Sequence, residues 1–455
     1  MDIDINEFLT QELPKAAFYA TYRAFPSAID GLKNSQRKIV YAVDKLNILE
    51  NDPEKVGILA ASTIKLTHYM HGPASLEDAT VGLANDYASS NTVNLLSPAG
   101  SFGTRTISAS AASRYLRTFK SNLYDYVIRK EDRNLLRAVV IEGQSCEPTF
   151  FLPIIPLVLV NGSLGLGYGF KNEILSRDPI QIIDHLVVLL KGKKQSVKDT
   201  PQAMLPWIKN FKGEVFWDDG VVIRGSFKRV KKNVIEIDDL PFTTSCNSFK
   251  KTLDDLLSKQ TIAEYDEYNL GDTIRYVVKR EGIDRASDAE IIKMFKLEVR
   301  PNEYFNLLDV ATQVIEFEGP KEYIDWFLKF RLDKYTDRRT LLLGQLESDL
   351  IELDAMRRCV GLVVSGEVVI FKRTESDIRD QFAKHLEMGD DLFKTLMRKP
   401  INSFTAEKIE ELNRSYEKIT QEIEVLTGKT PADIWIEELK ELRVMILKDR
   451  TKDQD

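Results

Sequence analysis

The chain has 455 residues, of which 43% are hydrophobic and 29% charged, and its formal net charge is −7. This length exceeds one ordinary core and indicates several domains, while no apolar run approaches the roughly 18 residues that span a membrane. The acidic start lacks the features of a signal peptide, and three widely spaced cysteines favour neither disulfides nor a zinc site, so we expect a protein of a reducing cytoplasm.

The first 160 residues carry apolar side chains at helical spacing, and we predict helices with short connections there. We expect breaks in this pattern at Pro26 and at Asp30-Gly31. The apolar stretch FFLPIIPLVLVNGSLGLGYGF, residues 150–170, contains two prolines that a regular helix does not tolerate. It therefore predicts buried irregular or strand structure.

The middle of the chain, from about residue 200 to 320, changes to a strand pattern. Residues 213–242, GEVFWDDGVVIRGSFKRVKKNVIEIDDLPF, alternate apolar and polar side chains around a DDG turn, which predicts hairpins and a sheet. Two short amphipathic segments, FKKTLDDLLSKQ and SDAEIIKMF, predict helices beside it. We therefore expect a mixed α/β domain, and we interpret EYDEYNLGD, residues 264–272, as a surface turn.

The last third of the chain predicts two long helices. The first keeps a heptad spacing of apolar residues with polar lapses at Arg339 and Asp349, and the second runs from near Thr405 to Gly428 with Pro431 just beyond. Two such helices could pair antiparallel as a coiled coil, with the globular segment 363–397 at the tip. A plain helical bundle is the alternative that periodicity alone leaves open.

One short stretch favours chemistry at a tyrosine. In ISASAASRYLRTFK, residues 107–120, small residues end at Arg114-Tyr115, and between Gly100 and Lys120 there are four cations and no acidic side chain. A phenol with a pKa near 10 is about one part in a thousand ionised at neutral pH, so a nucleophilic tyrosine needs a cation, a base or a metal. If the stretch is helical, Arg114 and Arg117 share a face. Read alone, a tyrosine beside arginines is more often structural.

Basic and histidine residues cluster elsewhere in the N-terminal part. RAFPSAIDGLKNSQRK supplies Arg23, Lys33, Arg37 and Lys38, which form either a phosphate-binding face or a solvated basic one. THYMHG places His68 and His71 three residues apart; a metal pair would need Glu77 or Asp78 as well, and a phosphate contact or proton shuttle by His71 is favoured. The sequence contains neither a GxxxxGK[ST] phosphate loop nor a convincing acidic magnesium site.

These ordered blocks resemble one family: the DNA-breaking subunit of type IIA topoisomerases, as in gyrase A and topoisomerase IV. The resemblance rests on these blocks and spans nearly the whole chain: RAFPSAIDGLKNSQRKIVYA, MHGPASLEDA, GSFGTR followed by SASAASRY, LPIIPLVLVNGSLGLGYGF, and GEVFWDDGVVIRGSFK with IEIDDLPF. Its length looks closest to the separate medium subunit of T-even-type phages, which implies action in the host cytoplasm.

The resemblance implies a multidomain α+β fold. It implies a winged-helix-type DNA-binding and cleavage domain over residues 1–160, a mixed α/β tower domain over 161–320, and a coiled coil with a globular dimerisation gate over 321–455.

The resemblance also assigns roles to residues. Tyr115 matches the nucleophile that becomes joined to the 5′ phosphate of broken DNA, Arg114 matches the partner that stabilises the developing charge, and His71 completes the expected catalytic set. Leu166 falls where the family wedges an apolar side chain between base pairs. The expected DNA-binding cations are Arg23, Lys33, Arg37, Lys38, Arg105, Arg117 and Lys120.

The partners implied are double-stranded DNA, a second copy of the chain, and an ATPase/Toprim subunit. This partner would bind ATP and hold most of the Mg²⁺, and two copies of Tyr115 would cut opposite strands under two-fold symmetry. Because the chain ends soon after the second heptad helix, we expect relaxation or unlinking of DNA in place of negative supercoiling. The role of His68 stays open, since the family's commoner motif has a proline between the two histidines.

Two other classes compete with this interpretation. Site-specific recombinases also use tyrosine, but near the C-terminus, whereas more than 300 residues follow Tyr115. A non-catalytic coiled-coil protein that organises DNA would keep the heptads and cations, yet it would have no need of Arg114-Tyr115 after a small-residue tract.

Overall fold

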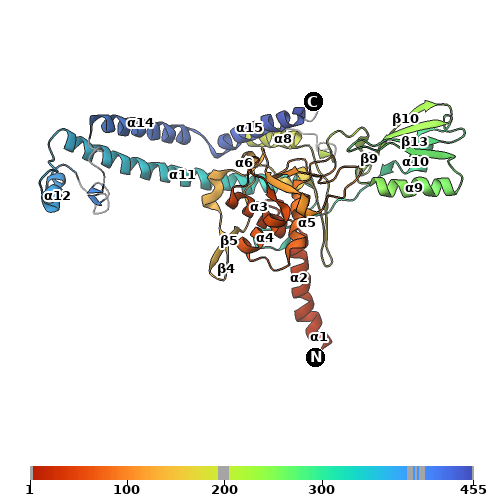
Figure 1. Ribbon diagram of the computed structural model, residues 1–455, viewed down its shortest axis with the longest axis horizontal. Coiled ribbons are helices and arrows are strands. Elements are labelled where there is room, and N and C mark those ends of the chain that lie inside the picture. The colour runs from red at the N-terminus through yellow and green to blue at the C-terminus, as the bar shows by residue number, and fades with distance from the viewer. Residues whose placement is uncertain (1–3, 193–203, 387–392, 395–396, 399–404, 453–455) are drawn as a thin grey trace. The chain divides into compact units, whose positions relative to one another are not determined.

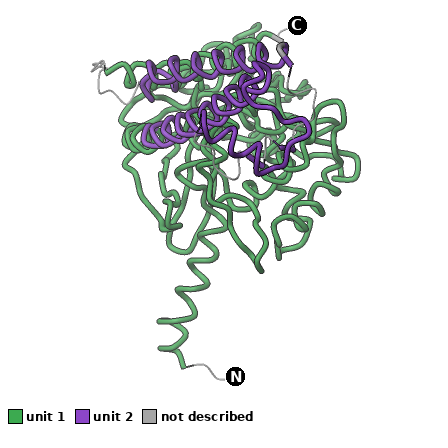
Figure 2. The backbone as a smooth tube through the Cα atoms, turned by 90° about the vertical axis from the view of Figure 1, so that its left-hand side faces the viewer, with its two compact units in different colours: residues 1–331, 436–455 green, residues 332–435 purple. Residues whose placement is uncertain are grey.

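The computed structural model describes residues 4–192, 204–386, 393–394, 397–398 and 405–452. These residues form two compact units, unit 1 (residues 1–331 and 436–455) and unit 2 (residues 332–435), coloured separately in Figure 2. In the described part of the chain, no helix is both long and apolar enough to cross a membrane.

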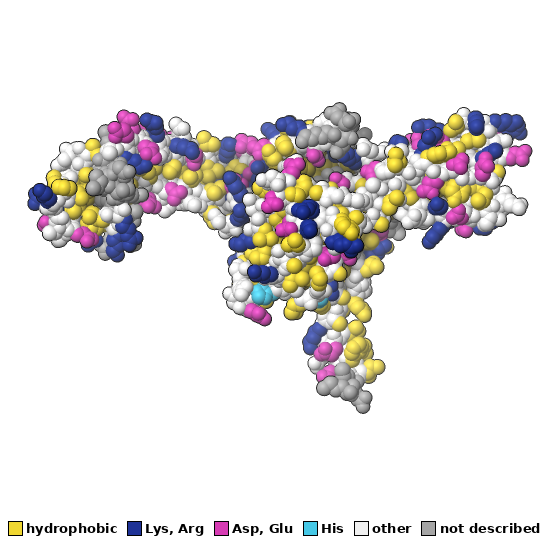
Figure 3. Space-filling model, in the orientation of Figure 1, with side chains coloured by type: hydrophobic (Ala, Val, Ile, Leu, Met, Phe, Trp, Pro, Cys, Tyr) yellow, Lys and Arg dark blue, Asp and Glu magenta, His cyan; other side chains and the backbone are white. Residues whose placement is uncertain are grey.

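Unit 1 begins with a helical arm that projects from the rest of the unit (Figure 1). The arm consists of α1 (Ile5–Glu7), a π-helical turn (Phe8–Glu12) and α2 (Leu13–Ala24). Hydrophobic side chains of the arm, including Ile5 and Phe8, are exposed along it (Figure 3). The chain leaves α2 at Phe25, directly before the predicted break at Pro26.

Three helices and a small sheet follow, in the arrangement of a winged helix. The helices are α3 (Asn34–Leu46), α4 (Val56–Thr67) and α5 (Pro73–Ala84), and the strands are β1 (Glu54–Lys55), β2 (Leu96–Ala99) and β3 (Arg117–Lys120). The strands form an antiparallel sheet in the order β1-β3-β2. The apolar face of α3 is fully buried, because its hydrophobic residues recur at helical spacing.

The nucleophile stretch is not a helix, which corrects one expectation. Ser113–Tyr115 form a single 3₁₀ turn, and Arg117–Lys120 form strand β3 at the centre of the sheet. Leu116 and Thr118 are fully buried while Arg117 between them is exposed, the alternation expected of a strand. Arg114 and Arg117 therefore do not share a helical face.

The Pro-rich stretch is buried and irregular through both prolines, as predicted, but a short helix begins directly after Pro156. The missing N–H and fixed backbone angle of proline suit the start of a helix. The elements of this region, in chain order, are α6 (Tyr124–Val127), a 3₁₀ segment (Lys130–Leu135), β4 (Ala138–Ile141), β5 (Gln144–Pro148), α7 (Leu157–Asn161), β6 (Ser163–Leu166), β7 (Lys171–Ile174) and α8 (Pro179–Leu190).

The hairpin β6–β7 packs closely against the end of α2. An added Cβ at Gly165 would lie 2.4 Å from the carbonyl oxygen of Ala24, so only glycine allows this approach. The hairpin leaves Leu166 71% exposed.

The predicted mixed α/β region contains two sheets within unit 1. One has the order β10-β11-β13-β12 and packs its apolar face on α9 and α10; the other has the order β14-β9-β8. EYDE at 264–267 is strand β12, so the interpretation of that segment as a turn was wrong at its start. The elements are β8 (Glu214–Trp217), β9 (Val221–Arg224), β10 (Ser226–Lys231), β11 (Val234–Asp239), α9 (Cys246–Ser258), β12 (Glu264–Glu267), β13 (Tyr276–Lys279), α10 (Asp288–Phe295), β14 (Glu298–Val299), β15 (Phe305–Leu308) and β16 (Val314–Phe317).

Unit 2 contains the two long helices predicted from the heptads. They are α11 (Pro320–Val364), which begins in unit 1, and α14 (Ala406–Gly428), capped by Thr405 as expected. Arg339 donates to the carbonyl oxygens of Leu426 (3.1 Å) and Thr427 (2.9 Å), while Arg357 lies near Asn413 (3.3 Å), so the helices run antiparallel (Figures 1 and 2). The polar lapse at Arg339 therefore caps the end of the partner helix.

The segment between these helices has a small core of its own. Cys359, Val368, Ile378, Phe382 and Phe393 are buried together around α12 (Glu375–Ala383). Parts of the predicted globular segment, 387–392 and 395–396, lie outside the described residues.

A further helix, α15 (Pro431–Lys452), was not expected. Pro431 was interpreted as a stop, yet it opens this helix, where proline is again well tolerated. Trp435, near its start, is buried and stacks on Tyr335 at 5.2 Å between ring centroids.

The three cysteines, Cys146, Cys246 and Cys359, are free and buried. Burial raises the pKa of the Cys359 thiol to about 11.

Candidate active site

Tyr115 lies at the surface at the end of the 3₁₀ turn, with 67% of its side chain exposed. The Arg114 guanidinium sits 4.7 Å from the centre of its ring. The next residue, Leu116, is fully buried, and its carbonyl oxygen accepts a hydrogen bond from the Val56 N–H (3.0 Å). An exposed phenol thus stands on a firmly anchored backbone with a cation beside it, which is a geometry suited to a nucleophile at a phosphate.

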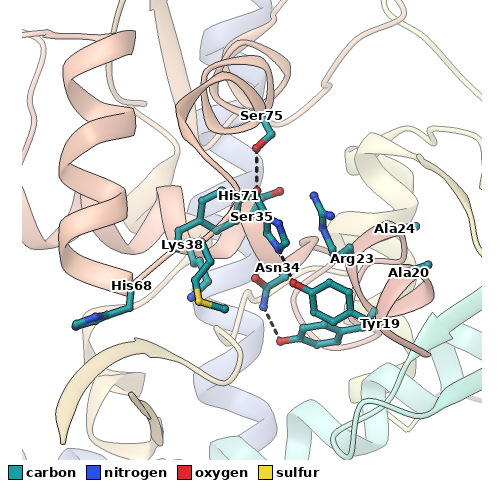
Figure 4. A pocket seen from close by; sticks show the side chains of 13 residues that line it. Tyr19, Ala20, Arg23, Ala24, Asn34, Ser35, Lys38, His68, His71 and Ser75 are labelled. Atoms are coloured by element: carbon teal, nitrogen blue, oxygen red, sulfur yellow. Dashed lines mark hydrogen bonds between the residues drawn. The ribbon is translucent and has the colours of Figure 1, made fainter. Parts of the chain in front are cut away.

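A separate pocket of about 420 Å³ surrounds His71, between the end of α2, the start of α3 and the turn before α5 (Figure 4). Tyr115 and Arg114 are not among its lining residues. The lining residues are Tyr19, Ala20, Tyr22, Arg23, Ala24, Asn34, Ser35, Lys38, His68, Tyr69, Met70, His71 and Ser75.

His71 is held by aromatic neighbours within this pocket. Its Nε2 shares a hydrogen bond with the Tyr19 hydroxyl, and its ring packs edge-on against Tyr69 at 5.3 Å (Figure 4). Partial burial and the nearby positive charge of Arg23 lower the pKa of His71 below 6.5. The imidazole is therefore neutral at neutral pH and would meet a phosphate as a hydrogen-bonding group.

His68, whose role the sequence left open, points away from His71 (Figure 4). It ends α4 in a left-handed conformation, at φ +48°. Its Nε2 donates to Gln144 Oε1 at 3.1 Å, and its Nδ1 lies 3.9 Å from Glu142 on the β4–β5 hairpin. These contacts assign His68 to holding that hairpin against α4.

Arg23, Lys33 and Leu166 lie within one neighbourhood, because β6 packs on α2. Arg23 is exposed in the last turn of α2, and Lys33 donates to the Leu164 carbonyl oxygen of β6 at 2.7 Å. Burial lowers the pKa of Lys33. Leu166 stands exposed on the same strand as Leu164.

Four of the predicted DNA-binding cations have acidic partners instead, which corrects the expectation of an acid-free basic set. Their side chains are each at most 8% exposed, so the structure gives no support to direct phosphate contact by them. The pairs are Arg37 with Asp30 (2.7 Å), Lys38 with Glu147 (2.5 Å), Arg105 with Asp239 (2.6 Å) and Lys120 with Asp44 (3.0 Å).

Arg117, in contrast, keeps an exposed guanidinium on β3, with one N–H donated to the Pro53 carbonyl oxygen at 2.9 Å. Sequence reasoning missed Tyr19, Tyr69 and the acids that neutralise the buried cations. Only the aromatic residues before Arg23 were a local signal, since the acidic partners are distant in sequence.

In the part of the chain that the structure describes, no three His, Cys, Asp or Glu side chains gather closely enough to hold a metal ion. The residues around Tyr115 are cationic and do not fit Mg²⁺, so none of them is assigned to it.

A model of the DNA gyrase/topoisomerase IV A-type family, which describes the DNA-cleaving component of those enzymes, matches residues 23–440. The chain belongs to this family. It is 31% identical over 462 residues to the mitochondrial DNA topoisomerase 2 of Dictyostelium discoideum, covering 97% of this chain and 35% of that protein. It is 30% identical to DNA topoisomerase 2-alpha of Gallus gallus, covering 95% of this chain and 30% of that protein. The chain thus spans about a third of the length of these relatives.

The fold of this family member is also that of a solved structure. The DNA-binding, cleavage and re-ligation domain of Plasmodium falciparum topoisomerase II superposes with a TM-score of 0.85 at 24% identity, covering 99% of this chain and 66% of that one. The likeness confirms the predicted fold class. Nothing in these comparisons favours the alternative of a non-catalytic DNA-organising protein.

Proposed function

We propose that the chain is the DNA breakage-and-rejoining subunit of an ATP-dependent type IIA topoisomerase, with Tyr115 as its nucleophile. The observation that carries the proposal is the exposed phenol with the Arg114 guanidinium 4.7 Å from its ring, in a chain of this family. A second duplex would pass through the break, so that DNA is relaxed or unlinked.

The proposed reaction exchanges one phosphodiester for another. The Tyr115 oxygen, having lost its proton to solvent or a base, attacks a backbone phosphorus, and a phenolic P–O bond forms. The P–O3′ bond breaks, the 3′ oxygen takes up a proton, and the 5′ phosphate stays on the tyrosine. Because the number of P–O bonds is unchanged, the 3′-hydroxyl can reverse the step without further energy.

Arg114 would stabilise the charge that develops on the phosphate, because its guanidinium already lies over the phenol. Neutral His71 would supply a hydrogen bond to a phosphate near the pocket, with exposed Arg23 contributing charge. Lys33 would lie beside the backbone next to Leu166, whose exposed side chain is suited to wedging between base pairs.

The proposed assembly is a homodimer on double-stranded DNA with a partner subunit that binds ATP and supplies Mg²⁺ through a Toprim domain. Two copies of Tyr115 would then make the paired strand breaks. We further propose a separate subunit like the medium subunit of T-even-type phages, acting in the host cytoplasm; the sequence motifs alone support this. The proposed domains are residues 1–160 for DNA binding and cleavage, 161–320 for the tower, and 321–455 for the coiled coil and gate.

The test uses the purified chain, its ATPase/Toprim partner, Mg²⁺ and supercoiled plasmid, quenched with detergent. We expect linear DNA with protein attached at its 5′ ends, and complete loss of attachment in Tyr115→Phe, which removes only the reacting oxygen. Tyr126→Phe, in the short helix α6, is the matched control and should keep full activity. Attachment that persists in Tyr115→Phe, or plasmid binding without any attachment by the wild type and a competent partner, contradicts the proposal.

A further inference from the structure

The loop that leads to Tyr115, residues 100–112, is fastened to the four-stranded sheet by a turn far away in sequence. This turn, residues 270–273, joins β12 to β13. Thr106 donates to the Gly271 carbonyl oxygen from its hydroxyl (2.7 Å) and from its N–H (3.2 Å). The Arg105 N–H donates to Asp272 Oδ1 at 2.9 Å.

A buried ion pair strengthens the same attachment. The Arg105 side chain, 7% exposed, reaches Asp239 at the end of β11, whose side chain is 2% exposed. The second oxygen of Asp239 accepts the Lys212 N–H at 2.8 Å, so the carboxylate is fully used. A paired charge at this depth is costly to separate, and it therefore fixes the loop to the sheet firmly.

The loop is stiff enough to carry this attachment onward to the tyrosine. Gly103, at φ +105°, allows a tight fold in which an added Cβ would lie 2.8 Å from the Ser108 carbonyl oxygen. Two backbone bonds close the loop on itself, from Thr104 to Ile107 (2.7 Å) and from Ala111 to Ser101 (2.9 Å). The next turn begins at once, with the Tyr115 N–H bonded to the Ala112 carbonyl oxygen.

Asp272 also holds a second loop. Its other oxygen, Oδ2, accepts the N–H of Ala88 at 2.9 Å, in the segment that follows α5. One exposed carboxylate thus joins the loop after α5 to the loop before Tyr115.

We propose that Asp272 and the turn that carries it position Tyr115, so that strand cleavage depends on the β12–β13 turn being seated against the loop at 100–112. Asp272 is a positioning residue, since it acts through the backbone of Arg105 and Ala88. The inference rests on the proposed role of Tyr115. A small misplacement of a reacting group can lower a rate by as much as about a hundredfold, so a loosened loop should slow the chemistry more than it weakens DNA binding.

The experiment compares Asp272→Ala with Asp266→Ala, which removes another exposed carboxylate from the neighbouring strand β12. In the full complex with its partner subunit and Mg²⁺, we expect Asp272→Ala to form the covalent adduct about tenfold more slowly under single-turnover conditions, with the Kd for DNA changed less than twofold. Asp266→Ala should match the wild type in both. Asp272→Asn, which keeps one acceptor oxygen, should fall between Asp272→Ala and the wild type.

Hydrogen exchange of the chain without DNA provides a readout that does not depend on catalysis. We expect Asp272→Ala to speed exchange across residues 100–116, beyond the two amides that lose their acceptor. Unchanged cleavage, or cleavage and DNA binding that fall in equal proportion, would overturn the proposal. Exchange that rises only at Arg105 and Ala88 would overturn it too. A wild type that forms no adduct refutes the function of Tyr115 instead, and the exchange data still decide whether the tether exists.

Discussion

At the scale of single residues, burial separates side chains that look alike in the sequence. Arg117 and Lys120 lie three residues apart on β3, yet one guanidinium is exposed while the ammonium is paired with Asp44. The acidic partners of Lys120 and Arg105 are 76 and 134 residues away in the chain. A local count of charges could not reveal these pairs, whereas the identity of Tyr115 and Arg114 as candidates needed only their immediate neighbours.

The environment of His71 gives a prediction about proton binding. Arg23→Gln removes a positive charge that disfavours the imidazolium, so we expect the pKa of His71 to rise towards 6.5 while burial keeps it below that value. NMR titration of histidine-labelled protein measures this directly, because the chain has only four histidines. Lys15→Gln, an exposed cation on the same helix, should leave the titration unchanged. An unshifted His71 in Arg23→Gln contradicts the assigned cause.

At the scale of elements, periodicity predicted α3, α9, α10, α11 and α14 well, because each buries one face along its whole length. It failed where a residue has two opposite uses. Pro156 and Pro431 were interpreted as breaks and in fact precede or open helices. The segment after Ser113 was too short to distinguish a helix from a turn and strand, and its central place in a sheet comes from partners β1 and β2 that the sequence separates widely.

The contact of β6 with α2 gives a prediction about stability. Gly165→Ala places a methyl group 2.4 Å from the Ala24 carbonyl oxygen, so we expect overpacking to cost about 1–3 kcal/mol. Gly82→Ala, in α5 with open space around it, should be neutral or stabilise by up to about 1 kcal/mol. Thermal unfolding followed by circular dichroism compares the two. Equal midpoints for both variants would show that the hairpin can shift away from α2 without cost.

At the scale of the whole molecule, an acidic protein is proposed to bind a polyanion. A net charge of −7 opposes DNA on average, so binding must depend on exposed cations in one region, since charges beyond about 10 Å are screened at ordinary salt. Ion pairing withdraws several cations from that task. The residues left exposed, Arg23, Arg114 and Arg117, should dominate the salt dependence.

Two variants on β3 test this. Arg117→Gln should reduce the slope of log K against log salt concentration by about one, because one phosphate contact is lost. Lys120→Met should leave that slope unchanged and lower the thermal midpoint, because Lys120 is paired within the fold. Fluorescence anisotropy of labelled duplex at several salt concentrations supplies the slopes. A reduced slope for Lys120→Met would mean that its pair with Asp44 opens on DNA.

The three buried thiols make the protein its own reporter of local opening. Cys146 lies in the β4–β5 hairpin, Cys246 in the core beneath the four-stranded sheet, and Cys359 in the small core of unit 2. A thiol reagent can reach each one only when its own neighbourhood opens, because all three are buried. Mass spectrometry of the labelled peptides would therefore time the opening of three regions separately, in the unaltered chain and without any added probe.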